Sequence, residues 1–210
     1  MNNRQITANP LAQYWVTLML LLAISGCSSS ASVKINTTFP QVLAEPKPIN
    51  VAILFNDSFS AYQARPTKNT HLDIGTAQVQ LFKNAFKGLF SEIEFVATAD
   101  SIGEQTSLVI TPSVREVQIS TPSDNYLNIF EVWIKYNLEI KTADGETLTN
   151  WFMPVYGKTP DSFMASKSAA IEHATITAIR DAGAKLILDF YRIPAVYDWV
   201  SKQRLKEDLG

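Results

Sequence analysis

The sequence predicts an α+β fold: a two-layer sandwich in which two main helices pack on one face of a mixed, mostly antiparallel sheet of four to five strands. Three observations support this. Residues 129–142 alternate between apolar and polar side chains, as a strand with one buried face does. Residues 73–90 and 162–190 instead repeat their apolar side chains at helical spacing. The predicted order is strand, helix, three or four antiparallel strands, helix.

The first half of the domain is expected to hold a strand, a helix and a second strand. Residues 50–55 form a short apolar run that ends at polar residues, which is typical of a buried strand. Residues 56–72 read as a long irregular connection, and such connections are often functional. Asp73 is a suitable N-cap for the first helix, and residues 92–96 read as the next strand.

The second half is expected to hold antiparallel strands and a long helix. Residues 107–120 read as a strand that bends or bulges at Pro112, because proline removes a ladder donor. Asp144 and Gly145 form a hairpin turn between residues 129–142 and a partner strand at 147–157. Alanines in the second helix allow it to approach the sheet closely, and the helix ends by Pro194.

The N-terminal residues read as a targeting segment. Arg4 is the only charge among the first 33 residues, and residues 15–24 form an apolar run. Ten helical residues rise about 15 Å, which is about half of a bilayer's hydrocarbon core. A signal peptide is therefore a better interpretation than a spanning helix. The alternatives are a plain signal peptide followed by a chance cysteine, or a buried helix.

The sequence Ile24-Ser25-Gly26-Cys27 resembles the lipobox of bacterial lipoproteins. The resemblance implies that the Cys27 thiol is diacylglycerated, that the signal peptide 1–26 is removed, and that the new amine is acylated, with palmitate as the typical chain. Two or more acyl chains anchor a protein stably to a membrane. Because Ser28 rather than aspartate follows, the resemblance also implies a lipid anchor in the outer membrane, at its periplasmic face.

The chain therefore divides into four expected segments. Residues 1–26 are the cleaved signal peptide, and residues 27–49 are the lipidated cysteine and a flexible tether rich in serine. Residues 50–193 form the α+β domain, and residues 194–210 a partly helical C-terminal tail.

The composition argues against most kinds of chemistry. The net charge is −2, with one cysteine and two histidines, so neither a nucleic-acid groove nor a histidine-rich metal site is expected. The sequence has no nucleotide-binding glycine loop, no HExxH and no Gly-x-Ser-x-Gly. We expect a protein that is not an enzyme and has no cofactor or metal. A hydrolase built on His71 is the third-ranked alternative, and His173 reads as a structural histidine.

Aromatic side chains are the remaining candidates for a binding surface. Phe59 and Tyr62 lie in the long connection, Tyr126 in the turn before residue 129, and Trp133 on the polar face of the strand at 129–142. Tyrosine and tryptophan supply large contact areas in protein interfaces, so these four are candidate partner contacts. The alternative is that most of them are half-buried packing residues.

The layout as a whole resembles small periplasmic lipoproteins of the outer membrane, of the YajG type and of the lipopolysaccharide-assembly type. Residues 136–140, the Asp144-Gly145 turn, residues 151–157 and the alanine-rich helix follow their pattern. The resemblance implies an accessory or assembly component of a cell-envelope machine that acts through protein–protein contacts. The alternative is a lipid or glycolipid binding module, which needs a sizeable apolar pocket between sheet and helices. A tightly packed layer argues against that alternative.

Overall fold

A computed structural model describes residues 31–35, 37–39 and 45–207, all within one unit that begins at Ala31. The predicted signal peptide and Cys27 lie outside the described residues. None of the helices in the described part is both long and apolar enough to span a bilayer.

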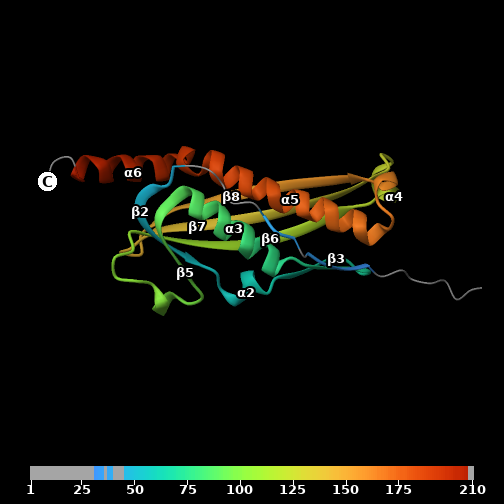
Figure 1. Ribbon diagram of the computed structural model, residues 1–210, viewed down its shortest axis with the longest axis horizontal. Coiled ribbons are helices and arrows are strands. Elements are labelled where there is room, and N and C mark those ends of the chain that lie inside the picture. The colour runs from blue at the N-terminus through green and yellow to red at the C-terminus, as the bar shows by residue number, and fades with distance from the viewer. Residues whose placement is uncertain (1–30, 36, 40–44, 208–210) are drawn as a thin grey trace, which may run out of the picture. The chain divides into compact units, whose positions relative to one another are not determined.

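The larger of two sheets has five strands in the order β5-β2-β6-β7-β8 (Figure 1). They are β2 (Lys47–Leu54), β5 (Phe90–Val96), β6 (Leu108–Ser120), β7 (Ile129–Thr142) and β8 (Thr147–Pro160). Strand β2 runs parallel to β5 and β6, whereas the long β6–β7 and β7–β8 ladders are antiparallel. This confirms the predicted α+β class and its mixed, mostly antiparallel sheet.

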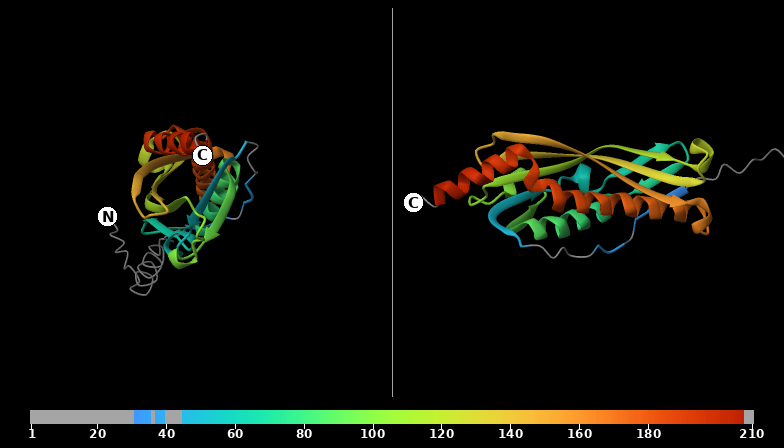
Figure 2. Two further views of the ribbon diagram at one scale, coloured as in Figure 1. Left: turned by 90° about the vertical axis from the view of Figure 1, so that its left-hand side faces the viewer. Right: turned by 90° about the horizontal axis from the view of Figure 1, so that it is seen from above.

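Helices α3 (Gly75–Leu89) and α5 (Lys167–Asp189) pack on one face of this sheet, and α6 (Pro194–Glu207) follows the short turn Phe190–Arg192 (Figure 2). The contact of α5 with β8 brings backbone against backbone. A Cβ atom placed on Gly157 would lie 2.0 Å from the Ala174 carbonyl oxygen and 2.4 Å from the Ala178 nitrogen. Only glycine therefore allows this helix to sit where it does.

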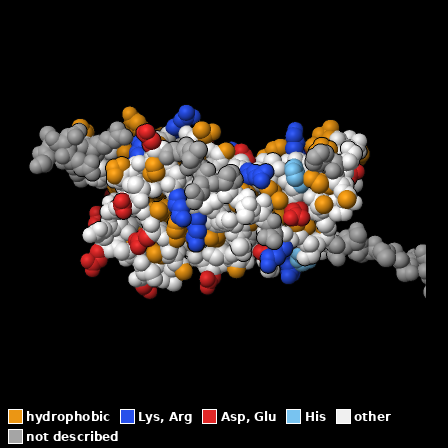
Figure 3. Space-filling view, viewed as in Figure 1, with side chains coloured by type: hydrophobic (Ala, Val, Ile, Leu, Met, Phe, Trp, Pro, Cys, Tyr) orange, Lys and Arg blue, Asp and Glu red, His pale blue; other side chains and the backbone are white. Residues whose placement is uncertain are grey.

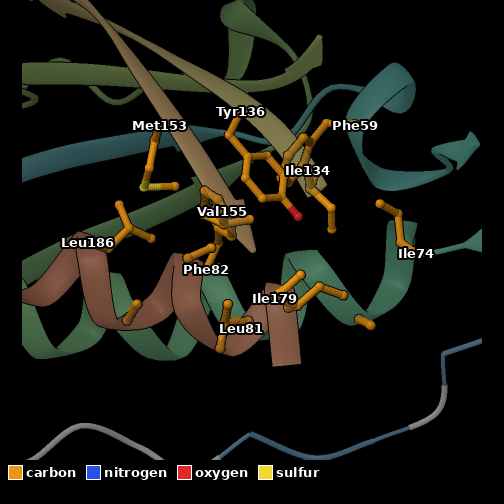
Figure 4. Close-up of a cluster of buried hydrophobic side chains, with 14 of the residues drawn as sticks. Phe59, Ile74, Leu81, Phe82, Ile134, Tyr136, Met153, Val155, Ile179 and Leu186 are labelled. Carbon is orange, nitrogen blue, oxygen red and sulfur yellow. The ribbon is translucent and has the colours of Figure 1, made fainter. Parts of the chain in front are cut away.

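The core lies between the helices and the sheet. As predicted, β7 buries alternate side chains, and they are Phe130, Val132, Ile134, Tyr136, Leu138 and Ile140. Figure 4 shows Tyr136 pointing into the cluster formed with β8 and the two helices. Its hydroxyl donates to Gln78 Oε1 at 3.1 Å, and Gln78 Nε2 donates to the Phe59 carbonyl at 2.7 Å. These two buried bonds connect the sheet, α3 and the short helix α2 (Asp57–Ser60), to which Phe59 belongs.

A second sheet of three strands was not predicted. It has the order β1-β4-β3, with β1 (Ala31–Lys34), β3 (Gln63–Thr67) and β4 (Thr70–Asp73). The described part of the expected tether 27–49 is therefore not all flexible: β1 pairs in parallel with β4, and Ile35 and Phe39 are buried. Likewise residues 56–72 are not irregular, since they contain α2 (Asp57–Ser60), β3 and most of β4.

The start of α3 also differs from the prediction. Asp73 ends β4 and is not the N-cap, a position taken by Ile74 without any side-chain cap. The backbone N–H groups of Ile74 and Gly75 donate instead to the Tyr62 carbonyl, at 3.3 and 3.2 Å. A Cβ atom on Gly75 would lie 2.3 Å from the Ser60 carbonyl oxygen, so glycine is needed where α2 presses on α3.

Strand β6 bulges, but not at Pro112. Pro112 pairs regularly with Leu138, and the register shift lies between Val114 and Glu116. The missing N–H of Pro112 is tolerated because β2 pairs with β6 only as far as Ile110. Pro112 thus follows the last residue of β6 that pairs with β2, so no hydrogen bond to β2 is lost.

We expect Gly157→Ala to lower the free energy of unfolding by about 2 to 3 kcal/mol, because the new Cβ atom meets backbone that cannot move aside. Gly103→Ala is the matched control, since its nearest neighbour is the flexible Glu94 carboxylate at 3.3 Å, and it should cost less than about 1 kcal/mol. Urea unfolding measures both. Equal losses in the two variants contradict the close contact of α5 with β8.

We expect Tyr136→Phe to cost about 1 to 3 kcal/mol, because it leaves the buried Gln78 carbonyl oxygen without its donor. Tyr197→Phe removes the same hydroxyl from a side chain that is 63% exposed and should cost almost nothing. Thermal unfolding of the two variants beside the wild type makes the comparison. A neutral Tyr136→Phe contradicts a stabilising role for the buried hydrogen bond.

Candidate functional site

Side chains on β6, β7 and β8 that point away from α3 and α5 form a solvent-facing surface, here called the outer sheet face. Its members include Arg115, Glu116, Gln118, Glu131, Trp133, Lys135, Asn137, Phe152 and Tyr156. Strand alternation determines this set, because the intervening residues of β7 are buried under the helices. Most of its members are half-buried or exposed, so this surface is open to a partner.

An aromatic pair lies towards one end of the outer sheet face. Trp133 and Tyr156 stand opposite each other on β7 and β8, with ring centroids 5.2 Å apart. The Tyr156 hydroxyl donates to Glu131 Oε1 at 2.6 Å, and Asn125 Nδ2 donates to Glu131 Oε2 at 3.1 Å. Burial, followed by the Glu131 hydrogen bond and its charge, raises the pKa of Tyr156 to about 12. The tyrosine therefore remains a neutral donor at physiological pH, and the pair is held in one orientation.

The β6 bulge adds a cation and an anion to the same surface. A bulge places two successive residues opposite one residue of the partner strand, and here Arg115 and Glu116 both lie on the outer sheet face. The Arg115 guanidinium lies 5.6 Å from the centre of the Phe152 ring and donates to Asn137 Oδ1 at 2.9 Å. Phe152 is 46% exposed, so a large apolar surface stays open beside the cation.

Glu116 lies next to this pair and is bound by its own neighbours. Lys135 Nζ lies 2.5 Å from Glu116 Oε2, and Gln118 Nε2 donates to Glu116 Oε1 at 2.6 Å. The hydrogen bond from Lys135, then the one from Gln118, lowers the pKa of the Glu116 carboxyl. The outer sheet face thus combines aromatic rings with charged side chains that are hydrogen-bonded to their neighbours.

The free edge of β8 is blocked in its middle by side chains of α5. Asp181 Oδ2 accepts a hydrogen bond from the Tyr156 N–H at 3.1 Å, and Lys185 Nζ donates to the Pro154 carbonyl. The two side chains also pair with each other at 3.2 Å. Because Pro154 has no N–H, an added strand would find little to bind at this point. A partner can engage the face of the sheet here, but not its edge.

The structure places only some of the four candidate contacts predicted from the sequence at the surface. The prediction for Phe59 is wrong: its side chain is 1% exposed and packs between Phe55 and Phe82 in the core, because α2 turns it inward. Tyr62 is half-buried against the core, and burial raises the pKa of its hydroxyl. Tyr126 is 90% exposed, in the turn between β6 and β7. Trp133 lies on the outer sheet face, as its place in the alternation predicted.

Sequence reasoning missed the Arg115–Phe152 pair. The signal was present, because apolar alternation in residues 108–120 changes phase between Val114 and Val117. That change marks the bulge and turns Arg115 onto the outer face. The position of Phe152 follows from its register with Asn137, which depends on where the β7–β8 hairpin turns.

The structure corrects the placement of His71 and keeps His173 in the second helix. His71 lies in β4, paired with Ser32, and not in a loop. His173 is exposed on α5, where its Nδ1 lies 2.8 Å from the hydroxyl oxygen of the buried Thr159. Within residues 31–35, 37–39 and 45–207, no group of three or more His, Cys, Asp and Glu side chains is placed to hold a metal ion.

A shallow apolar groove of about 610 Å³ lies between α3 and α5, on the side away from the sheet. Leu81, Ala85, Gly183 and Ile187 line it, and Arg180 is a polar group among the lining side chains. The layer beneath, between helices and sheet, is filled at Gly157 by direct backbone contact. At that point the layer has no space for a ligand, whereas the outer groove is open.

No protein-family model and no curated protein matches the sequence. Solved structures do. A Helicobacter pylori structure named as a neuraminyllactose-binding hemagglutinin homologue is similar over 83% of this chain and 100% of that one, with 13% identity and a TM-score of 0.52. At this identity the likeness shows a shared fold.

Lipoproteins are also among the solved structures to which the chain is similar. One from Caulobacter crescentus, named as a lipoprotein, has 17% identity, a TM-score of 0.38, and coverage of 61% of this chain and 84% of that one. A minor lipoprotein from Acinetobacter baumannii has 7% identity, a TM-score of 0.44, and coverage of 69% and 92%.

We expect alkaline pH to weaken the fold through Tyr156. Its pKa is raised on folding, so its contribution is complete below about pH 10, the ordinary tyrosine value, and is lost as the pH rises towards about 12. The free energy of unfolding should therefore fall less steeply over this interval in Tyr156→Phe than in the wild type. In Glu131→Gln, ultraviolet titration should show a lowered Tyr156 pKa. An unchanged pH profile in Tyr156→Phe contradicts the raised pKa of Tyr156, and an unchanged Tyr156 pKa in Glu131→Gln contradicts the contribution of the Glu131 hydrogen bond.

Proposed function

We propose that this protein is a lipoprotein of the outer membrane, facing the periplasm, and a non-enzymatic accessory or assembly component of a cell-envelope machine. Protein–protein contacts through the outer sheet face are its mode of action. The observation on which the proposal rests is that face: an open sheet surface that holds the Trp133–Tyr156 pair and the Arg115–Phe152 pair in fixed orientations.

The anchor is the first part of the mechanism. The lipobox-like Ile24-Ser25-Gly26-Cys27 supports acylation of Cys27. Two or three acyl chains hold a protein on a membrane, and confinement to a surface raises its effective concentration near any partner in the same membrane. A modest contact surface is then sufficient for a stable complex.

The composition of the outer sheet face suits such a contact. Interface cores are enriched in aromatic residues and arginine, and those residues dominate binding energies. Here Trp133, Tyr156 and Arg115 are already restrained by neighbouring side chains, so little side-chain entropy remains to be lost on binding. The blocked edge at Pro154 supports a face contact in preference to strand addition.

A second candidate is a binding module for a lipid or glycolipid, favoured by the apolar groove between α3 and α5. Its apolar floor suits an acyl chain, and Arg180 beside it suits an anionic head group. The name of the similar Helicobacter pylori protein points to a sialylated sugar as one such head group. The backbone contact at Gly157 leaves no space for a ligand between α5 and β8 at that point, which supports the surface groove as the site of this candidate.

Site-specific photo-crosslinking in intact cells tests the accessory role. A crosslinker at Phe152 should capture one reproducible envelope protein, whereas the same crosslinker at Leu188, which is 62% exposed and lines the α3–α5 groove, should not. Trp133→Ser should reduce capture from position 152 at least about tenfold, as loss of a dominant interface aromatic does.

Two results would count against this function. If Leu188 captures the partner or a lipid and Phe152 does not, the groove is the binding site and the second candidate is favoured. If Cys27→Ala remains membrane-bound and incorporates as much labelled palmitate as the wild type, the lipid anchor is wrong.

A further inference from the structure

The turn between β6 and β7 presents two apolar side chains to solvent. It contains α4 (Pro122–Asn125), followed by Tyr126, Leu127 and Asn128. Tyr126 is 90% exposed and Leu127 is 66% exposed, the highest values among the large apolar residues of the described chain. We call Tyr126 and Leu127 the apolar tip.

The backbone of this turn is strained at Tyr126, one of the two exposed apolar residues. Tyr126 has φ 56° and Asn128 has φ 53°, both in the left-handed region. Asparagine tolerates that region, whereas tyrosine rarely occupies it, and such outliers cluster at functional sites. Glycine would adopt this conformation without strain, so a tyrosine at this position indicates that its side chain has a function.

Hydrogen bonds within the turn hold the apolar tip in place. Asn125 Oδ1 accepts from the Leu127 N–H at 3.0 Å, and its Nδ2 donates to the Ile129 carbonyl at 2.9 Å. The Asp124 carboxylate accepts from the Thr121 N–H at 2.8 Å, which closes the turn on its other side. The tip is thus a rigid projection and not a loose loop.

The apolar tip lies at the end of the unit where the described chain begins. The N–H of Ala31, the first described residue, donates to the Asn69 carbonyl at the β3–β4 turn. Figures 1 and 2 show the β3–β4 hairpin and α4 at the same end of the sheet, with α6 at the other end. In Figure 3 apolar side chains gather at the end that carries α4.

Only three residues, Ser28 to Ser30, separate Cys27 from β1. Four peptide steps span at most about 14 Å when fully extended. An acylated Cys27 therefore holds the start of β1 close to the lipid surface, and the end of the unit that bears the apolar tip is held there with it.

We infer that the apolar tip is a second membrane contact, in which Tyr126 and Leu127 enter the phospholipid surface beside the acyl chains; this rests on the proposed acylation of Cys27. Leucine partitions into the acyl region, and the amphipathic tyrosine ring suits the head-group level. With an anchor and a tip in contact, the domain has one orientation on the membrane. The strands of the outer sheet face then point away from the bilayer, and α6 lies farthest from it.

The test uses the full mature, acylated protein in vesicles of phosphatidylethanolamine and phosphatidylglycerol. Acylation consumes the thiol of Cys27, the only native cysteine, so Leu127→Cys gives a single site for an environment-sensitive fluorophore. Leu205→Cys is the matched control, since Leu205 is 62% exposed and lies on α6. We expect the label at 127 to brighten and shift to the blue in vesicles, and brominated lipid to quench it, while the label at 205 stays as in water.

Flotation of the same vesicles separates the possible failures. If the protein floats with the vesicles and the label at 127 behaves like the label at 205, the membrane contact of the tip is wrong while the anchor stands. If the protein does not float, the anchor is wrong and the inference falls with it. As an independent variant, Tyr126→Asp with Leu127→Asp should float equally well but expose the turn to protease in vesicles, and protection equal to wild type also overturns the inference.

Discussion

The contact of α5 with β8 at Gly157 determines the form of the outer sheet face. Because the helix backbone lies directly on the strand, Asp181 and Lys185 reach the edge of β8 at Tyr156 and Pro154. That contact fixes the strand from which Tyr156 projects to the opposite side, where it meets Trp133. A wider separation of helix and sheet would loosen the edge and the aromatic pair together.

The sequence predicted the long elements well, because each one buries a face of its own. The alternation of β7 and the helical spacing of α3 and α5 persist over many residues, so pattern alone identifies them. The three-stranded sheet escaped prediction for the opposite reason. Its strands have four or five residues, and Ala31 pairs with Thr70, a partner that no local pattern reveals.

The candidate site could be predicted only in part. Trp133 was recognisable as an aromatic residue on the polar side of a regular strand. Phe59 was misplaced because the direction of its side chain depends on the four-residue helix α2, which the sequence did not indicate. The side chain of Arg115 lies on the outer face because of the bulge between Val114 and Glu116, whereas the sequence had predicted a bend or bulge at Pro112 instead. Such local irregularities decide what a surface presents, and periodicity does not encode them.

The ion pair of Asp181 and Lys185 at the edge of β8 affects how neighbouring copies of the protein can associate. Proteins tethered to one leaflet meet each other far more often than the same proteins in solution, and an uncovered strand would then nucleate lateral polymers. Two α5 side chains and a proline close that route at the centre of the strand. In the lipid-anchored form proposed above, this part of the β8 edge would not accept a strand from a neighbouring copy, and the outer sheet face stays accessible to a different protein.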